Sequence, residues 1–140
     1  MRWFAALLLV LYCGFIVRLT LFSPASSRPV FASASYVSEL VSGGRLDGAQ
    51  IEAISNVALF VPAGLLLAVV LGRLLLTIIV CVAASAAIEL TQLLWLPTRV
   101  PDPADVLHNG TGAALGVIVA WGLGIVCYPR LHSVHGSPAS

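Results

Sequence analysis

Four long apolar stretches alternate with shorter polar segments along this chain of 140 residues. Each stretch is close to the roughly 20 residues that an α-helix needs to cross the hydrocarbon core of a bilayer. The first apolar stretch, Trp3 to Phe22, contains a single charge, Arg18, near its end, from where the side chain can reach the interface. The pattern predicts an all-α, polytopic membrane protein with a four-transmembrane-helix bundle. The predicted spans cover residues 1–22, about 54–71, 74–96 and about 103–128.

The polar segments indicate how these spans are connected. Residues 23–53 are rich in Ser, Pro and Gly and carry charges of both signs, so we expect an outer loop. Gly72-Arg73 is the only turn signal before the third span, which predicts a tight antiparallel hairpin. Residues 129–140 are expected to form a disordered cytoplasmic tail. A cleavable signal peptide ending at Ala34 is disfavoured, because the first apolar stretch is too long and ends well before that site.

The start of the fourth span carries helix-initiation signals. Asp102 is placed to cap the helix, Pro103 suits its first position, and Asp105 is an acid in the first turn. The segment from Pro97 to Pro101 is therefore expected to be the loop that leads into this helix.

The composition indicates that the chain is embedded in a lipid bilayer. Hydrophobic residues make up 59% of the chain and charged residues only 9%, against about 25% charged residues in a soluble domain. The mean hydropathy is +1.02. The formal net charge is +1 and no basic patch is present, so nucleic acid is not an expected partner. Membrane lipid is.

The cysteines give no indication of a metal site or a disulfide framework. Cys13, Cys81 and Cys127 all lie inside apolar stretches, where free thiols behave as small hydrophobic side chains. Their spacing does not fit a zinc site. We predict no metal and no cofactor, and the sequence does not indicate an oligomeric state.

The distribution of arginines bears on orientation. With four spans, both termini lie on one side of the membrane, and this side carries Arg2, Arg73 and Arg130 without any acid. The opposite side carries as many loop arginines, Arg28, Arg45 and Arg99, together with all the loop acids, so the basic residues alone barely discriminate between the two orientations. The very short turn between the second and third spans favours the cytoplasmic side. We therefore expect both termini in the cytoplasm.

An acidic residue lies well inside the third predicted span. Glu89 is about 10 Å from the helix end at a rise of 1.5 Å per residue. An ionisable side chain at such a position costs roughly 2.5–3.5 kcal/mol on insertion scales and normally faces the bundle interior. Ser85 and Gln92 lie on the same helical face as Glu89. This stripe predicts a polar surface that faces the other helices.

The fourth span has a matching stripe. Asp105, Asn109, Gly112 and Gly116 follow helical spacing on one face, polar at the start and small at the end. Small residues let membrane helices approach closely, so Gly112 and Gly116 are predicted packing positions. The second span contributes a similar series, from a polar residue at its start to a small one. This series is Asn56, Phe60 and Gly64, with Gly64 the third predicted packing glycine.

The polar ends of the second, third and fourth spans are expected to converge at one membrane surface, which the predicted topology makes the outer one. A purely structural interpretation remains open: Glu89 with Arg99 as an ion pair, Asp102 as a cap, and His108 as a solvated side chain. Interhelical hydrogen bonds contribute only about 0.6 kcal/mol on average. The predicted cluster comprises Asn56, Glu89, Gln92, Arg99, Asp102, Asp105, His108 and Asn109.

A catalytic interpretation rests on the two carboxylates of this cluster. Glu89 and Asp105 are candidates for an acid–base pair, because burial and neighbouring charges can separate the pKa values of two acids. No nucleophile motif, metal-ligand set or phosphate-binding loop accompanies them. His108 with these acids would make an oxygen-rich metal site, but spacing alone does not specify one. Whether the protein is an enzyme stays open, with a non-enzymatic role favoured.

At these residues the sequence resembles the VanZ-like family of bacterial membrane proteins. The matching segments follow the family's order over about residues 54–120, and they assign a three-helix core to residues 54–128. One departure is the pair Pro101 and Pro103 around Asp102, which puts the orientation of Arg99 towards Asp105 in question. The segments are Asn56 to Gly64, Ile88 to Gln92, Arg99, Pro101 to Val106 and Asn109 to Gly116.

The resemblance implies a protein of the bacterial plasma membrane, and the family's founding member is associated with low-level resistance to the glycopeptide teicoplanin. Three functions fit: an envelope protein that binds a cell-wall precursor, lipid headgroup or glycopeptide; an intramembrane enzyme acting on a lipid-linked substrate through Glu89 and Asp105; and a structural accessory subunit. The residues that correspond to the family's shared polar positions are the predicted ligand-binding set. They are Asn56, Glu89, Gln92, Arg99, Asp105 and Asn109.

Overall fold

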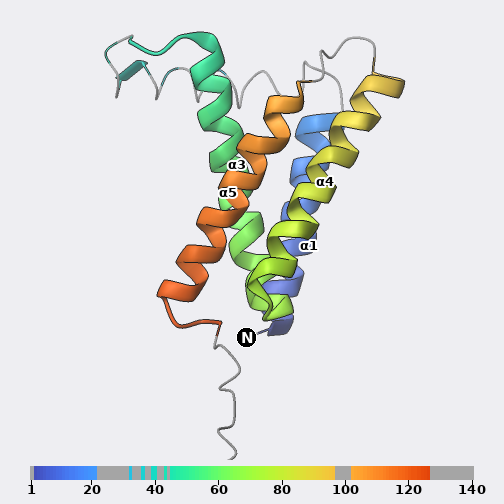
Figure 1. The fold of residues 1–140 in the computed structure, drawn as a ribbon, viewed down its shortest axis with the longest axis vertical. Coiled ribbons are helices and arrows are strands. Elements are labelled where there is room, and N and C mark those ends of the chain that lie inside the picture. The colour runs from blue at the N-terminus through green and yellow to red at the C-terminus, as the bar shows by residue number, and fades with distance from the viewer. Residues whose placement is uncertain are drawn as a thin grey trace, which may run out of the picture.

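The computed structural model describes residues 2–21, 32, 36, 39–40, 43, 45–96 and 102–126, and within these residues the chain is helical, without a strand. Four long helices form an antiparallel bundle, as predicted (Figure 1). Helices α1 and α4 run in one direction, and α3 and α5 run in the other (Figure 1). The bounds are α1 Arg2–Leu21, α3 Gly48–Leu71, α4 Leu74–Trp95 and α5 Pro103–Gly122.

Helices α1, α3 and α4 are long and apolar enough to cross a membrane. Helix α5 has 20 residues, as many as α1, but its first half is polar. This helix packs more extensively on α3 than on any other described helix. The least apolar helix therefore lies against two apolar ones, α3 and α4.

Local sequence signals determine where α3 begins and where the turn between α3 and α4 lies. Asp47 and Gln50 form a capping box: Asp47 Oδ1 accepts from the Gln50 N–H at 2.8 Å, and Gln50 Oε1 accepts from the Asp47 N–H at 3.1 Å. This cap starts α3 at Gly48, earlier than the predicted start near Ile54. At the other end Gly72, with a φ of 65°, takes the left-handed conformation that makes the two-residue turn possible.

Helix α5 begins where the sequence predicts and ends earlier. Asp102 is the N-cap, with Oδ1 accepting from the Ala104 N–H at 2.8 Å, and Pro103 is the first helical residue. The helix ends at Gly122 instead of near Tyr128. Gly124 adopts a left-handed φ of 65°, and the next N–H, of Ile125, bonds back to the Ala120 carbonyl at 3.1 Å. This glycine-terminated cap stops the helix before Pro129 is reached.

The interface between α3 and α5 depends on glycine. A Cβ on Gly112 would overlap the Val57 carbonyl oxygen, and a Cβ on Gly116 would overlap that of Val61. Both are backbone atoms of α3 that cannot move aside. All three predicted packing glycines are at such close approaches, and Gly64 of α3 faces the backbone of Ala113. The small residues thus let two helix backbones meet, as membrane helix pairs commonly do.

Helix α1 lies at the edge of the bundle and packs mainly on α3. Its outward face is strongly exposed, with Trp3 90% accessible, as expected for a lipid-facing surface. Two hydrogen bonds fasten it to the core. The Tyr12 hydroxyl donates to the Leu59 carbonyl at 2.7 Å, and Gln92 Nε2 donates to the Thr20 carbonyl at 3.0 Å.

The cysteines follow the predicted pattern where they are described. Cys13 is an exposed free thiol on α1, and Cys81 is a buried free thiol on α4. Cys81 packs with Phe60 and Ala113 in one of the two apolar clusters of the core. Cys127 and the predicted tail at 129–140 lie outside the described residues.

Candidate functional site

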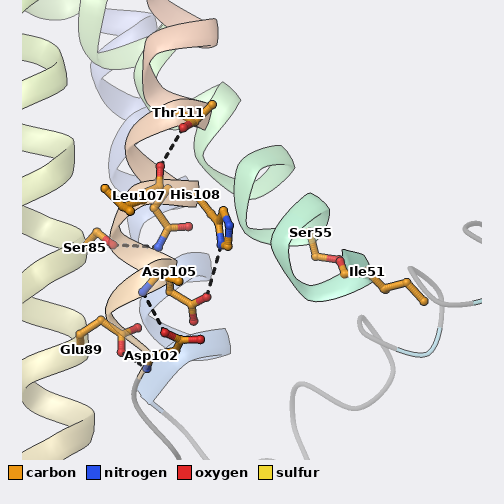
Figure 2. Close-up of polar contacts among 11 residues, drawn as sticks. Ile51, Ser55, Ser85, Glu89, Asp102, Asp105, Leu107, His108 and Thr111 are labelled. Atoms are coloured by element: carbon orange, nitrogen blue, oxygen red, sulfur yellow. Dashed lines mark hydrogen bonds and ion pairs between the residues drawn. The ribbon is translucent and has the colours of Figure 1, made fainter. Parts of the chain in front are cut away.

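The N-terminal ends of α3 and α5 and the C-terminal end of α4 lie at the same end of the bundle (Figure 1). Polar residues from these three helices meet there, as the sequence predicts. Figure 2 shows Ser85 and Glu89 of α4 opposite Asp105 and His108 of α5, with Asp102 at the start of α5. We call this group the polar cluster. Its members are Glu52, Asn56, Ser85, Glu89, Asp102, Asp105, His108 and Asn109.

Glu89 connects α4 to the start of α5. Its Oε2 accepts a hydrogen bond from the backbone N–H of Asp102 at 3.0 Å (Figure 2). The N-terminus of a helix carries a partial positive charge, so this position also favours the carboxylate electrostatically. The predicted partner of Glu89, Arg99, lies outside the described residues, as do Pro97 and Pro101. Within the described residues, the partner of this carboxylate is backbone.

Asp105 connects α5 to α3. Its carboxylate lies close enough to the side chain of Asn56 for the two to interact. His108, one turn further on, places Nδ1 at 3.8 Å from Asp105 Oδ1 (Figure 2). The side chain of Asp105 is 20% exposed and that of His108 is 36% exposed. These two side chains are partly accessible, and two other members of the cluster, Glu52 and Asp102, are exposed.

Asn109 lies deeper, one turn below Asp105. Its Nδ2 donates to the Ser85 hydroxyl at 2.8 Å, which links α5 to α4. Both residues are buried: Ser85 is fully inaccessible and Asn109 is 7% exposed. The other end of the amide, Oδ1, is buried and has no hydrogen-bond partner among the described residues. The bond considered between Asn56 and Asn109 is not formed in the described structure: Asn109 bonds to Ser85, and the side chain of Asn56 interacts with the Asp105 carboxylate.

Gln92 has a different position from the one that its spacing suggests. It is buried, at 8% exposed, and its Nε2 donates to the Thr20 carbonyl of α1. Residues three positions apart do not lie exactly above one another on a helix, so their side chains point in somewhat different directions. Glu89 therefore bonds to the start of α5, whereas Gln92 bonds to α1. Its side-chain amide nitrogen is thus used to hold α1, and this predicted ligand-binding residue is a packing contact in the described structure.

The charge of the cluster is negative. The Glu89 carboxylate interacts electrostatically with the carboxylates of Asp105 and Asp102 and with that of Glu52. Glu52 is not part of the cluster predicted from the sequence, although it lies one turn before Asn56 on the same face of α3. Among the described residues, the only ion-pair contact to these acids comes from His108. The cluster therefore presents acceptors and negative charge, which suit a ligand rich in donors.

Two hydroxyl groups near the cluster are already engaged. Ser55 donates to the Ile51 carbonyl and Thr111 donates to the Leu107 carbonyl, both within their own helices (Figure 2). The described residues contain no group of three His, Cys, Asp or Glu side chains arranged to hold a metal ion. What the arrangement offers chemically is hydrogen-bond acceptance and a pair of carboxylates, Glu89 and Asp105.

These features define an all-α membrane protein whose core helices carry a polar cluster at one end. The model of the VanZ/LLP1 family matches residues 9–126. The chain therefore belongs to the VanZ/LLP1 family. The match includes most of α1 as well as the three helices that bear the polar cluster. No curated protein and no solved structure matches the chain.

Proposed function

We propose that this protein binds the polar head of a cell-envelope molecule at the polar cluster, without converting it chemically. The ligand is a cell-wall precursor, a lipid headgroup or a glycopeptide antibiotic. The observation that carries the proposal is the placement of Asp105 and Glu89, carboxylates from two helices, at one end of a membrane bundle. The cluster lies at the outer face of a bacterial plasma membrane and both termini lie in the cytoplasm.

The exposure of the cluster supports binding from the membrane surface. Asp105 and His108 are accessible at 20% and 36%, whereas Ser85 and Asn109 beneath them are buried. A ligand head entering from this end meets the accessible pair first and the buried acceptors next. Through this contact the protein contributes to glycopeptide resistance, and the VanZ/LLP1 membership supports teicoplanin as the antibiotic to test first.

The test is susceptibility to teicoplanin in a strain that depends on the protein. Asp105→Asn removes the charge of the accessible carboxylate with little change of volume, and we expect it to lower resistance at normal membrane levels. Glu39→Gln is the matched control, because Glu39 is an exposed acid away from the cluster. Equal susceptibility of the wild type and Asp105→Asn, with equal protein levels, would refute binding through the cluster.

A second function is favoured by one observation. The carboxylates of Glu89 and Asp105 interact electrostatically, which is the arrangement that separates the roles of an acid and a base in hydrolytic sites. An intramembrane enzyme acting on a lipid-linked precursor would use them in this way. Purified protein would then convert such a precursor, and Glu89→Gln and Asp105→Asn would each abolish turnover while leaving binding measurable.

A further inference from the structure

The polar cluster has more hydrogen-bond acceptors than donors. The Glu89 carboxylate interacts electrostatically with three others, those of Asp105, Asp102 and Glu52. A carboxylate accepts several hydrogen bonds and donates none when ionised. Within the described residues, the hydrogen bonds that these acids accept come from two backbone groups, the N–H of Asp102 and the N–H of Ala104. The side chains of Asn56 and His108 also lie near Asp105.

A second and independent observation concerns Asn109. Its Oδ1 is buried without a partner, and the residue is only 7% exposed. Burying an acceptor without a donor is costly, so native proteins leave few such atoms. The bond from Nδ2 to Ser85, at 2.8 Å, holds the amide in place, so Oδ1 projects from the side of the amide opposite to Ser85.

The side-chain amide of Asn109 lies at the buried end of the polar cluster. Asn109 is one helical turn below Asp105 on α5, and Ser85 is one turn below Glu89 on α4. The amide that joins Asn109 and Ser85 therefore lies beneath the two carboxylates. Its free oxygen adds a third acceptor to theirs.

From these two observations we infer that the polar cluster binds a primary ammonium group. This inference rests on the proposed function and specifies the chemistry of the ligand. An ammonium group carries three N–H donors and a positive charge. The cluster supplies acceptors from Glu89, Asp105 and Asn109, and its described residues include more acidic than basic side chains. Phosphate and other anions meet four carboxylates of the same sign, so the anionic part of a ligand head lies away from this point.

Two molecules of a bacterial envelope bring a primary ammonium to the membrane surface: a lipid with an ethanolamine headgroup, and a lipid-linked cell-wall precursor with a lysine in its peptide. Full-length protein in nanodiscs of phosphatidylglycerol separates them. One arm adds phosphatidylethanolamine or its N-acetylated form. The other adds the lysine-containing precursor or the same precursor acetylated at the lysine. Acetylation removes the charge and leaves the rest of each molecule unchanged.

We expect the wild type to bind one of the free amines, and acetylation of that ligand to weaken binding about tenfold or more, since hydrogen bonds to charged groups are the stronger ones. Glu89→Gln keeps an acceptor for the Asp102 N–H and removes a charge, so it stays folded while binding weakens. Asp105→Asn is expected to weaken binding and to make it insensitive to acetylation. Glu39→Gln is expected to behave as the wild type.

The outcomes separate this inference from the proposed function. If the precursor binds and Asp105→Asn weakens binding, but acetylation has no effect, the ammonium inference is overturned and the proposed function stands. If neither the free nor the acetylated ligands bind, the ammonium inference is overturned, and the proposed function is then decided by the teicoplanin susceptibility of Asp105→Asn. If binding is lost on acetylation and retained in both Glu89→Gln and Asp105→Asn, the ammonium is recognised elsewhere and the inference about the polar cluster is wrong.

Discussion

The side-chain amide of Asn109 donates to the hydroxyl of Ser85, 2.8 Å away, across the interface of α5 and α4. Both residues are buried. The bond lies one helical turn below Glu89 and Asp105, between these carboxylates and the apolar core of Phe60, Cys81 and Ala113. The side-chain amide of Asn109 therefore has two roles: its nitrogen forms a bond between helices, and its oxygen belongs to the candidate binding site.

Breaking this bond at one end should cost more than removing both ends. Ser85→Ala leaves the Asn109 amide buried without any partner, and we expect a loss of about 1–3 kcal/mol in unfolding free energy. The double variant Ser85→Ala with Asn109→Leu removes both polar groups and should be less destabilised than the sum of the single variants. Equilibrium unfolding in detergent measures the cycle, and strict additivity would show that the two side chains are not coupled.

The glycine contacts between α3 and α5 predict strong position dependence. Gly112→Ala and Gly116→Ala place a methyl group against backbone carbonyl oxygens of α3, so the helices must separate and we expect a loss of about 1–3 kcal/mol. Gly14→Ala on α1 is the matched control, because a Cβ there meets nothing within 4 Å. It should be neutral or slightly stabilising, since alanine is the better helix former. Thermal unfolding of the three variants side by side decides the question.

Glu89 is expected to restrain the start of α5. In Glu89→Ala the Asp102 N–H loses its acceptor, so its hydrogen exchange should accelerate about tenfold, the equivalent of one modest hydrogen bond. Glu89→Gln keeps an acceptor oxygen and should leave exchange near the wild-type rate. Mass spectrometry of peptides that cover Asp102 gives the rates. Equal rates in all three proteins would contradict this role for Glu89.

The attachment of α1 should depend on Tyr12. Tyr12→Phe removes the hydroxyl that donates to the Leu59 carbonyl at 2.7 Å and leaves the ring in place. We expect a loss of about 0.6 kcal/mol, the average for a hydrogen bond between membrane helices. Tyr36→Phe is the control, because Tyr36 is 65% exposed. A calorimetric or fluorescence melt in detergent compares them, and equal melting temperatures would assign the attachment of α1 to apolar packing and to the Gln92–Thr20 hydrogen bond.

Much of the fold could be predicted because its signals are local. The lengths of the apolar stretches predicted the four helices. Gly72 predicted a turn and Asp102 predicted a helix cap, and the geometry of both depends only on neighbouring residues. The convergence of Glu89 and Asp105 also followed, since helix direction and register place both near one end. The early end of α5 at Gly122 was missed because Pro129 was taken as the stop, when Gly124 ends the helix first.

The pairing of side chains could not be predicted, because it depends on how the helices rotate about their axes. Gln92 shares a face with Glu89 in a helical projection, yet it bonds to Thr20 of α1. The sequence gives no spacing rule between helices, so it could not choose whether Asn56 would meet Asp105 or Asn109. Here Asn56 meets Asp105, and the partner of Asn109 is Ser85.

The close contact between α3 and α5 has a consequence for biogenesis. These helices are not neighbours in the chain, because α4 is synthesised between them. Helix α5 also falls short of the apolarity that marks the other three helices as spans, and its polar half is covered by α3 and α4. We therefore expect the integration of α5 into the bilayer to depend on the helices that precede it in the chain. The bundle is completed by its last helix, and the polar cluster comes into existence only at that final step.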